Sequence, residues 1–326
     1  MLRWVISLVT AVGLAAPAWS EGTYELPERV QIVPRLTYYS ALPEVYFRDT
    51  GESRWTKSGR VLNETIGGVR GVSNDLFDIA TAPVRKPVLF GAAAVGTAFL
   101  VLNDYEFTSF YQDKIEPIFD GFDLPPIVNA GQLADEDEFL LAGIAATYAY
   151  GFAFNDERAQ VAAVLSSKAI AYSYLTSHVL LKPVFGRARP TPNLSSYPKG
   201  STTAAMPTHF TADPYRWRES GGIQFRAAAQ GTSFPSYHYT QFFAAARVYS
   251  GVYDNSLLPY AAATLLSVSN IRGHRHWVSD MAAGAFLGTV IGQVVLNNYS
   301  ERRGISFDAM PSVSRDGAGI TFTMNF

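Results

Sequence analysis

AQVAAVLSSKAIAYSYLTSHVLL, residues 159–181, is a long apolar stretch, and KPVFGRARP, residues 182–190, follows it with three cations and a proline. The apolar stretch has the length of a buried helix and predicts a helical core. Cations placed together repel each other and are best tolerated when an anion completes the group, so this helix end predicts a local anion site. The alternative is a solvated helix end whose cations complement the helix dipole.

Segments of the same character occur on both sides of this stretch and also have the length of helices. They are apolar and rich in alanine, and they cover residues 87–103, 139–155, 239–252, 257–271 and 280–298. Together with 159–181 they predict an all-α fold, a single bundle of about six core helices. A chain of 326 residues with 48% hydrophobic content is long enough to bury such a core.

The regions outside the bundle differ in pattern. Residues 21–86 show no sustained period and predict an irregular N-terminal extension with some helix, before a helical domain at 87–300. The connection 191–232 is rich in Thr, Ser, Pro and Gly, and loops of this length are usually functional or disordered. Residues 301–326 alternate apolar and polar side chains around the sequence DGAG and predict a short C-terminal β-hairpin.

The N-terminus has the pattern of a secretory signal peptide. Residues 1–20 contain one basic residue, an apolar run and a small-residue end, so we expect a mature chain that begins near Glu21 and is periplasmic. An uncleaved anchor is the alternative, although the apolar run is short for a membrane span. The chain contains no cysteine, so it has no disulfide framework.

Several predicted helices are uncharged enough that a membrane bundle is an alternative to a buried core. With residue 21 outside, spans at 87–103 and 139–155 would place the 104–138 connection in the cytoplasm. That connection is strongly acidic, whereas cytoplasmic loops carry an excess of Lys and Arg. The sequence therefore favours a bundle in the periplasm and leaves peripheral contact with a membrane open.

The overall charge excludes one class of partner. The 28 acidic and 26 basic side chains give a net charge of -2, which argues against a nucleic-acid-binding surface. An anion site in this chain must therefore be a local cluster of cations.

A second stretch, SFPSYHYTQFFAAARVY (residues 233–249), predicts an anion site at a helix start. Ser236 precedes an apolar helix whose first turn contains His238. A helix start presents free backbone N–H groups and a positive dipole end to an anion, and a histidine there can act as a general acid. A core or capping histidine is the alternative interpretation.

A third stretch, SNIRGHRHWVSDMAAGAFLG (residues 269–288), places His276 and Asp280 four positions apart and so on one face of a helix. A carboxylate that accepts a hydrogen bond from one imidazole nitrogen leaves the other nitrogen free to attack or to accept a proton. A surface ion pair would show the same spacing. Half of a metal site at His274 and His276 is a further alternative, without other ligands at the required spacing.

Taken in order, the three stretches resemble the type 2 phosphatidic acid phosphatase superfamily, which also includes bacterial class A acid phosphatases and vanadium haloperoxidases. The family pattern is Lys, six residues, Arg-Pro; then Pro-Ser-Gly-His; then Ser-Arg, five residues, His, three residues, Asp. The resemblance covers roughly residues 87–298. It implies that the cations hold a phosphoryl group and that 87–300 is a helical phosphatase domain.

Carried over residue by residue, the resemblance implies a role for each matching position. His276 would be the nucleophile that forms a phosphohistidine, Asp280 would orient it, and His238 would protonate the leaving oxygen. The groups implied to bind the phosphate oxygens are Lys182, Arg189, Ser236 and the backbone N–H of Tyr237. The family scheme needs no metal and no other cofactor, because the cations stabilise the developing charge.

Two positions depart from the family pattern. Tyr237 replaces the glycine before the histidine, but its N–H can still bind phosphate. Asn270 replaces the arginine of the third motif, and its amide can donate to phosphate without supplying charge, which predicts lower turnover or a different substrate class. Arg272 or Arg275 could supply that charge, although neither lies at the family position.

We therefore expect an exported, metal-independent phosphatase that hydrolyses a phosphomonoester or pyrophosphate. Its expected partner is a phosphorylated small molecule or lipid, and a lipid phosphate is favoured because the family often acts on lipids and aromatic residues surround the motifs. Two alternatives remain open. One is a vanadium-dependent haloperoxidase with vanadate on His276, and the other is an anion-binding protein of the same fold, catalytically impaired by Asn270.

Overall fold

The computed structural model describes residue 47 and residues 51–128, 133–202, 209–217, 232–303, 306–314 and 317–325. The predicted signal peptide lies outside these residues. The first helices are α2 (Arg54–Ile66), α3 (Gly68–Arg85), α4 (Pro87–Leu102), α5 (Asp104–Phe110), η2 (Tyr111–Ile115), η3 (Glu116–Ile118) and α6 (Asp135–Ala153). The others are α7 (Glu157–Ser173), η4 (Tyr174–Leu181), α8 (Lys182–Phe185), η5 (Leu194–Ser196), α9 (Tyr237–Tyr253), α10 (Leu257–Val268), α11 (Ile271–His274) and α12 (Val278–Arg302).

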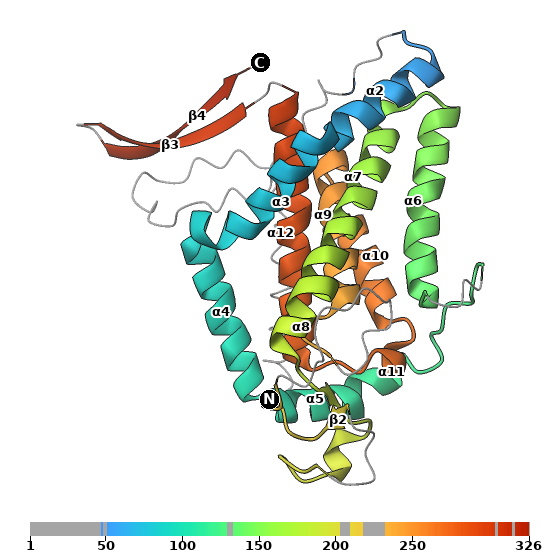
Figure 1. The fold of residues 1–326 in the computed structure, drawn as a ribbon, viewed down its shortest axis with the longest axis vertical. Helices are drawn as coiled ribbons and strands as arrows, with labels where there is room; N and C mark the ends of the chain where they lie inside the picture. The colour runs from blue at the N-terminus through green and yellow to red at the C-terminus, as the bar shows by residue number, and fades with distance from the viewer. Residues whose placement is uncertain are drawn as a thin grey trace.

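The fold is the all-α bundle that the sequence predicts (Figure 1). The six apolar segments correspond to α4, α6, α7 continued by η4, α9, α10 and α12. The helix of the opening stretch begins after Asp156, whose side chain accepts the Ala159 N–H. It continues through the π-helical turn η4 to Leu181, so that Lys182 follows directly at the end of the apolar run.

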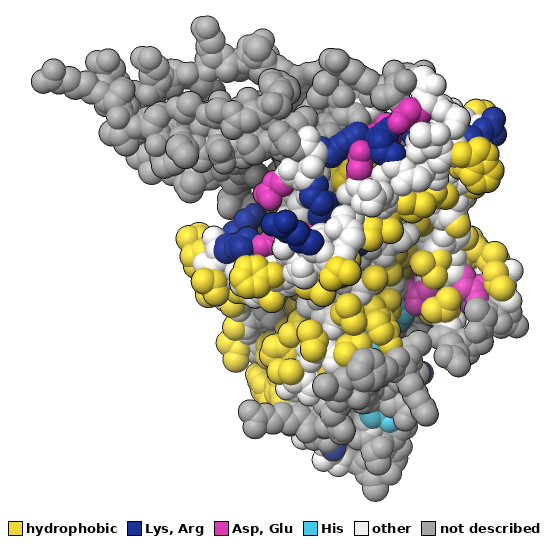
Figure 2. Space-filling model, turned by 45° about the horizontal axis from the view of Figure 1, so that its top comes forward, with side chains coloured by type: hydrophobic (Ala, Val, Ile, Leu, Met, Phe, Trp, Pro, Cys, Tyr) yellow, Lys and Arg dark blue, Asp and Glu magenta, His cyan; other side chains and the backbone are white. Residues whose placement is uncertain are grey.

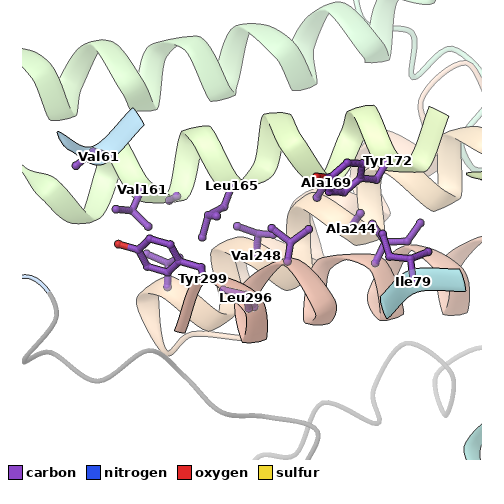
Figure 3. Packing of buried hydrophobic residues seen from close by; sticks show 14 residues of the cluster. Val61, Ile79, Val161, Leu165, Ala169, Tyr172, Ala244, Val248, Leu296 and Tyr299 are labelled. Atoms are coloured by element: carbon purple, nitrogen blue, oxygen red, sulfur yellow. The ribbon is translucent and has the colours of Figure 1, made fainter. Parts of the chain in front are cut away.

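The main hydrophobic core lies between α7, α9 and α12. Figure 3 shows side chains from these helices meeting, among them Leu165 of α7, Val248 of α9 and Leu296 of α12, all fully or almost fully buried. Val61 of α2 and Ile79 of α3 belong to the same cluster. These two helices form within residues 21–86, where the sequence predicts an irregular extension with some helix. Each helix buries a narrow apolar face and exposes many charged and polar residues, so its sequence shows no sustained apolar period.

A buried polar cluster fixes α3 to the bundle. Asp75 is fully buried, and its carboxylate lies 2.5 Å from the Lys168 ammonium of α7. The same carboxylate accepts hydrogen bonds of 2.9 Å from the Tyr172 hydroxyl and from the Asn298 amide of α12. Three helices thus share one satisfied carboxylate, which is the condition under which a charge is tolerated in a core.

Helix α12 packs so closely against α9 that the main chains of the two helices are in contact. A Cβ on Gly284 would lie 2.5 Å from the carbonyl oxygen of Ser236, and one on Gly292 would lie 2.6 Å from that of Ala244. Gly288, between them, would meet the carbonyl oxygen of Thr240 in the same way. Three glycines at i, i+4 and i+8 therefore form the α12 face that touches α9.

Helix α4 has an apolar surface on all sides and stands at the edge of the bundle (Figure 1). It contacts α12 through Phe90, whose ring lies 5.2 Å from that of Phe286. Among its residues only Leu100 is buried, whereas Val88 and Val95 are 82% and 73% exposed. Figure 2 shows hydrophobic side chains spread over the flank of the molecule, next to a band of charged side chains.

Within the part of the chain that the structure describes, α12 is the one helix long and apolar enough to cross a membrane, and α3 with α4 forms a second candidate that is bent by 77°. Most of the apolar window of α12 is buried inside the bundle, as expected of a core helix.

Two short sheets complete the described structure. Strand β1 (Arg189–Pro190) pairs in parallel with β2 (Phe210–Thr211), with Arg189 opposite Phe210. Strand β3 (Ser306–Ser314) pairs antiparallel with β4 (Gly317–Asn325), and Ser314 lies opposite Gly317. This second pair confirms the predicted C-terminal hairpin.

The contact between α9 and α12 predicts the effect of filling a glycine. Gly288→Ala is expected to destabilise the protein by about 1–3 kcal/mol, because the added methyl group meets a backbone carbonyl that cannot rotate away. The control is Gly96→Ala in α4, where a Cβ meets no atom within 4 Å. It should be neutral or stabilising by up to about 1 kcal/mol through helix propensity. Denaturant unfolding followed by circular dichroism measures both, and equal effects would contradict the close backbone contact.

Candidate active site

The three sequence motifs meet at one end of the bundle, around α8 and the starts of α9 and α12 (Figure 1). Backbone hydrogen bonds join them. The Ser233 N–H donates to the carbonyl oxygen of Arg187 at 2.8 Å, and the Ser236 N–H donates to that of Asp280 at 3.0 Å. The Trp277 indole N–H donates to the carbonyl oxygen of Ala188 at 2.8 Å. Each motif is therefore fixed to another by main-chain atoms.

Lys182 and Arg189 form the cationic part of the site. Lys182 begins α8 and is 3% exposed, while Arg189 lies in β1 and is half-buried. Burial, and then the charge of Arg189, lowers the pKa of Lys182 to about 7. Burial also lowers the pKa of Arg189, to about 10. An anion bound between Lys182 and Arg189 would raise both pKa values again, because a negative charge favours the charged forms of the two side chains.

Arg187, the third cation of the opening stretch, is already neutralised by the protein. It is fully buried, and its guanidinium lies 2.7 Å from the carboxylate of Asp104 and 2.8 Å from that of Asp280. Its remaining donors reach the Ser279 hydroxyl and the carbonyl oxygen of Pro214. Of the three cations in KPVFGRARP, Arg187 is therefore the one that these two carboxylates neutralise.

His276 and Asp280 lie at the start of α12 and are both buried. The Nδ1 atom of His276 lies 3.6 Å from Oδ2 of Asp280, longer than a hydrogen bond but short enough to tighten when a ligand binds. The same Oδ2 accepts the Trp277 N–H at 2.9 Å. Burial raises the pKa of Asp280, and the charge of Arg187 acts against that rise.

The start of α9 supplies Ser236, Tyr237 and His238. The Ser236 hydroxyl is buried and has no hydrogen-bond partner among the described residues, which leaves it able to donate to a ligand. Tyr237 is the first residue of α9, so its N–H belongs to the free amides of the helix start. The Nε2 atom of His238 lies 3.6 Å from Oδ2 of Asp137, at the start of α6.

Asn270, the residue at the position of the family arginine, is at the surface. It is exposed and has a left-handed backbone with φ of 48°, and its side chain folds over Gly273. Arg275 lies close to Arg189, because its charge contributes to the lowered pKa of Arg189. Its carbonyl oxygen also accepts a hydrogen bond of 3.4 Å from Arg189.

Sequence reasoning missed two carboxylates of this region, Asp104 and Asp137. Both lie in the acidic segment 104–138, which served only as evidence on topology. The balance of charge could have predicted these two carboxylates. The stretch 182–190 contains three cations, and Asp280 was the only carboxylate predicted near them. A buried site with such an excess of positive charge requires further carboxylates.

A known protein family matches the part of the chain that contains these site residues. Residues 161–303 match the model of the PAP2 superfamily. This segment contains all three motifs, from Lys182 to Asp280, and the match confirms the resemblance found in the sequence. No curated protein and no solved structure matches the chain.

The lowered pKa of Lys182 predicts that anion binding depends on pH. Because the ammonium loses its proton above about pH 7, the affinity for sulfate should fall about tenfold per pH unit above that value. Sulfate is the probe because its own charge does not change in this range. Calorimetric titration between about pH 6 and pH 8.5 would measure the effect.

Lys182→Arg is the matched control, because an arginine keeps its charge throughout this range. Its alkaline loss of affinity should be much smaller. The same slope in both proteins would mean that Lys182 is not the group that titrates.

Proposed function

We infer that this chain, whose residues 161–303 belong to the PAP2 superfamily, hydrolyses a phosphomonoester or a pyrophosphate through a phosphohistidine at His276. PAP2 proteins are generally phosphatases, so the reaction class is that of a phosphoric ester hydrolase. One observation carries the finer proposal. A buried lysine, Lys182, and a half-buried arginine, Arg189, share one end of the bundle with a buried histidine that faces a carboxylate.

In the proposed first step, Nε2 of His276 attacks phosphorus and the P–O bond to the leaving group breaks. Asp280 faces Nδ1 of the same ring, so it holds the tautomer and balances the charge that forms. His238 gives its proton to the leaving oxygen, and the carboxylate of Asp137, 3.6 Å from its Nε2 atom, faces the ring. In the second step water attacks the phosphohistidine, His238 takes a proton from it, and the P–N bond breaks.

The phosphate oxygens would be held by Lys182, Arg189, the Ser236 hydroxyl and the Tyr237 N–H. The two cations stabilise the charge that develops on these oxygens, which is the task that a metal ion performs in many other phosphoryl-transfer enzymes. We therefore propose a reaction that needs no metal. Arg275 would supply the positive charge that Asn270 lacks.

The proposed substrate is a lipid phosphate. Apolar side chains follow directly on the cationic residue of α8, where Val184 is 68% and Phe185 37% exposed. The ring of Phe185 packs at 4.8 Å on that of Phe234, just before the second motif. An acyl chain could lie on these groups while its phosphate binds to Lys182, since apolar surface near an anion site favours amphipathic ligands.

We further propose that the mature protein is periplasmic and contacts a membrane through α4. The exposed valines of this helix, the apolar flank in Figure 2 and the exposed residues of α8 support the proposal. Large exposed apolar patches on proteins mark contacts with other proteins or with membranes. Acyl chains would cover this apolar flank at no cost to the fold.

The two histidines can be tested separately. His276→Ala is expected to abolish phosphate release, because the proposed covalent intermediate forms on this imidazole. His238→Ala should lower the rate on an alkyl phosphate by about 10²–10⁴-fold. Its effect on nitrophenyl phosphate should be much smaller, because that leaving group departs without a proton. Phosphate release by the purified mature protein in EDTA, with vanadate titrated as inhibitor, measures all three effects.

Other outcomes would favour the alternatives. Halide oxidation on addition of vanadate would indicate a haloperoxidase. Phosphate binding without hydrolysis of an aryl or a lipid phosphate would indicate an anion-binding protein that has lost turnover. Undiminished hydrolysis by the His276→Ala protein would reject the assigned nucleophile.

The membrane contact predicts a loss of vesicle binding on charging α4. Val95→Glu should reduce flotation with vesicles of phosphatidylglycerol and phosphatidylethanolamine, because a carboxylate is costly to place among acyl chains. Val69→Glu is the matched control, since Val69 is 88% exposed near the charged residues of α3. Equal flotation of the two variants would remove α4 from the contact.

A further inference from the structure

Asp104, Arg187 and Asp280 form a buried row of carboxylate, guanidinium and carboxylate behind His276. All three side chains are fully buried, and the two ion pairs measure 2.7 and 2.8 Å. They come from three separate parts of the chain, the start of α5, the residues before β1 and the start of α12. Two negative charges and one positive charge leave the row with one net negative charge. An imidazolium or a phosphorylated imidazole at His276 would complement that charge.

Arg187 fixes which oxygen of Asp280 faces the histidine. Its Nη1 atom binds Oδ1 of Asp280, while Oδ2 accepts the Trp277 N–H and lies 3.6 Å from Nδ1 of His276. A carboxylate held at both oxygens cannot rotate. The planar guanidinium is suited to this task because its donors have a rigid, forked geometry.

Two indole rings shield the guanidinium from water. The centre of the Arg187 guanidinium lies 4.6 Å from the Trp217 ring and 5.1 Å from the Trp277 ring. Water between these groups would weaken the electrostatic effect of Arg187 on Asp280. Its exclusion keeps the local dielectric low and that effect strong.

Asp104 binds Arg187 through Nη2, the terminal nitrogen that does not bind Asp280, and it also binds the first turn of α12. Its Oδ1 accepts the Ser279 N–H at 3.0 Å, and its Oδ2 accepts from Arg187 and from the Ser279 hydroxyl. Asp104 therefore neutralises part of the charge that Arg187 would otherwise present to Asp280. It also fixes the helix start on which His276 and Asp280 depend.

We propose that Asp104 and Arg187 are positioning residues for the phosphatase reaction, which set the orientation of Asp280 and, through it, the basicity of His276. The inference rests on the proposed function and adds two residues to it. The charged and titratable groups that act on Asp280 are Asp104, Lys182, Arg187, Arg189 and His276. Variants of Asp104 and Arg187 change the charge behind Asp280 without touching the phosphate.

The test uses two variants that change this charge in opposite directions. Arg187→Met removes a positive charge, so Asp280 and His276 both hold protons at higher pH. Asp104→Asn removes a negative charge and keeps the side-chain shape, so both groups lose protons at lower pH. The acidic limb of the kcat/KM profile on nitrophenyl phosphate should therefore move up by about one pH unit in Arg187→Met and down in Asp104→Asn.

Arg272→Met is the matched control for charge, because Arg272 is exposed and pairs 3.2 Å from Asp120 at the surface. Its acidic limb should not move. If Arg187→Met does not fold, Arg187→Lys replaces it, and its expected result is a lower kcat with a small shift of the limb, since the charge stays and the fork is lost. Lower activity in the Asp104 and Arg187 variants without opposite shifts would overturn the proposal.

A second readout separates this inference from the proposed function. NMR titration of ¹⁵N-labelled histidine follows His276 directly, and its signal is identified among the 5 histidines by its absence in His276→Ala. Its pKa should rise in Arg187→Met and fall in Asp104→Asn even if the wild type hydrolyses nothing. Hydrolysis with an unmoved His276 pKa would reject the positioning role and leave the phosphatase intact.

Discussion

The backbone contact between α9 and α12 is the constraint on which the core and the site both depend. Because Gly284, Gly288 and Gly292 carry no side chain, the two helices approach until their main chains touch. The same approach lets the Ser236 N–H reach the carbonyl oxygen of Asp280 at 3.0 Å. The second and third motifs are therefore joined by the packing that also buries Val248 against Leu296.

The cations at the end of this bundle have two different tasks. Arg187 is matched by two carboxylates, and the loss of a partner from such a buried group costs about 3–5 kcal/mol. Burial lowers the pKa of both Lys182 and Arg189, and the charge of Arg189 lowers that of Lys182 further. The charge of Asp280 only partly opposes this lowering. The protein thus bears an electrostatic cost at the place where an anion would relieve it, a common property of functional sites.

The sequence determined the helices and most of the residues that meet at the site. A hydrophobic segment of helical length can be recognised from neighbouring residues alone. The helices predicted at 159–181 and 280–298 therefore agree with α7 continued by η4 and with α12. Motif spacing likewise indicated Lys182, His238 and His276. Helices α2 and α3 were harder to predict, because each buries a narrow face that is recognisable only against the helices that cover it.

Only the tertiary structure decided which charges meet. Asp104 and Arg187 lie far apart in the chain, and no local pattern indicates that their side chains form a 2.7 Å ion pair. The fold also pairs Arg187 with Asp280, and it places Arg275 beside Arg189 while Asn270 is exposed. Helix formation follows from neighbouring residues, whereas charge pairing follows from burial, because only a desolvated charge must find a specific partner.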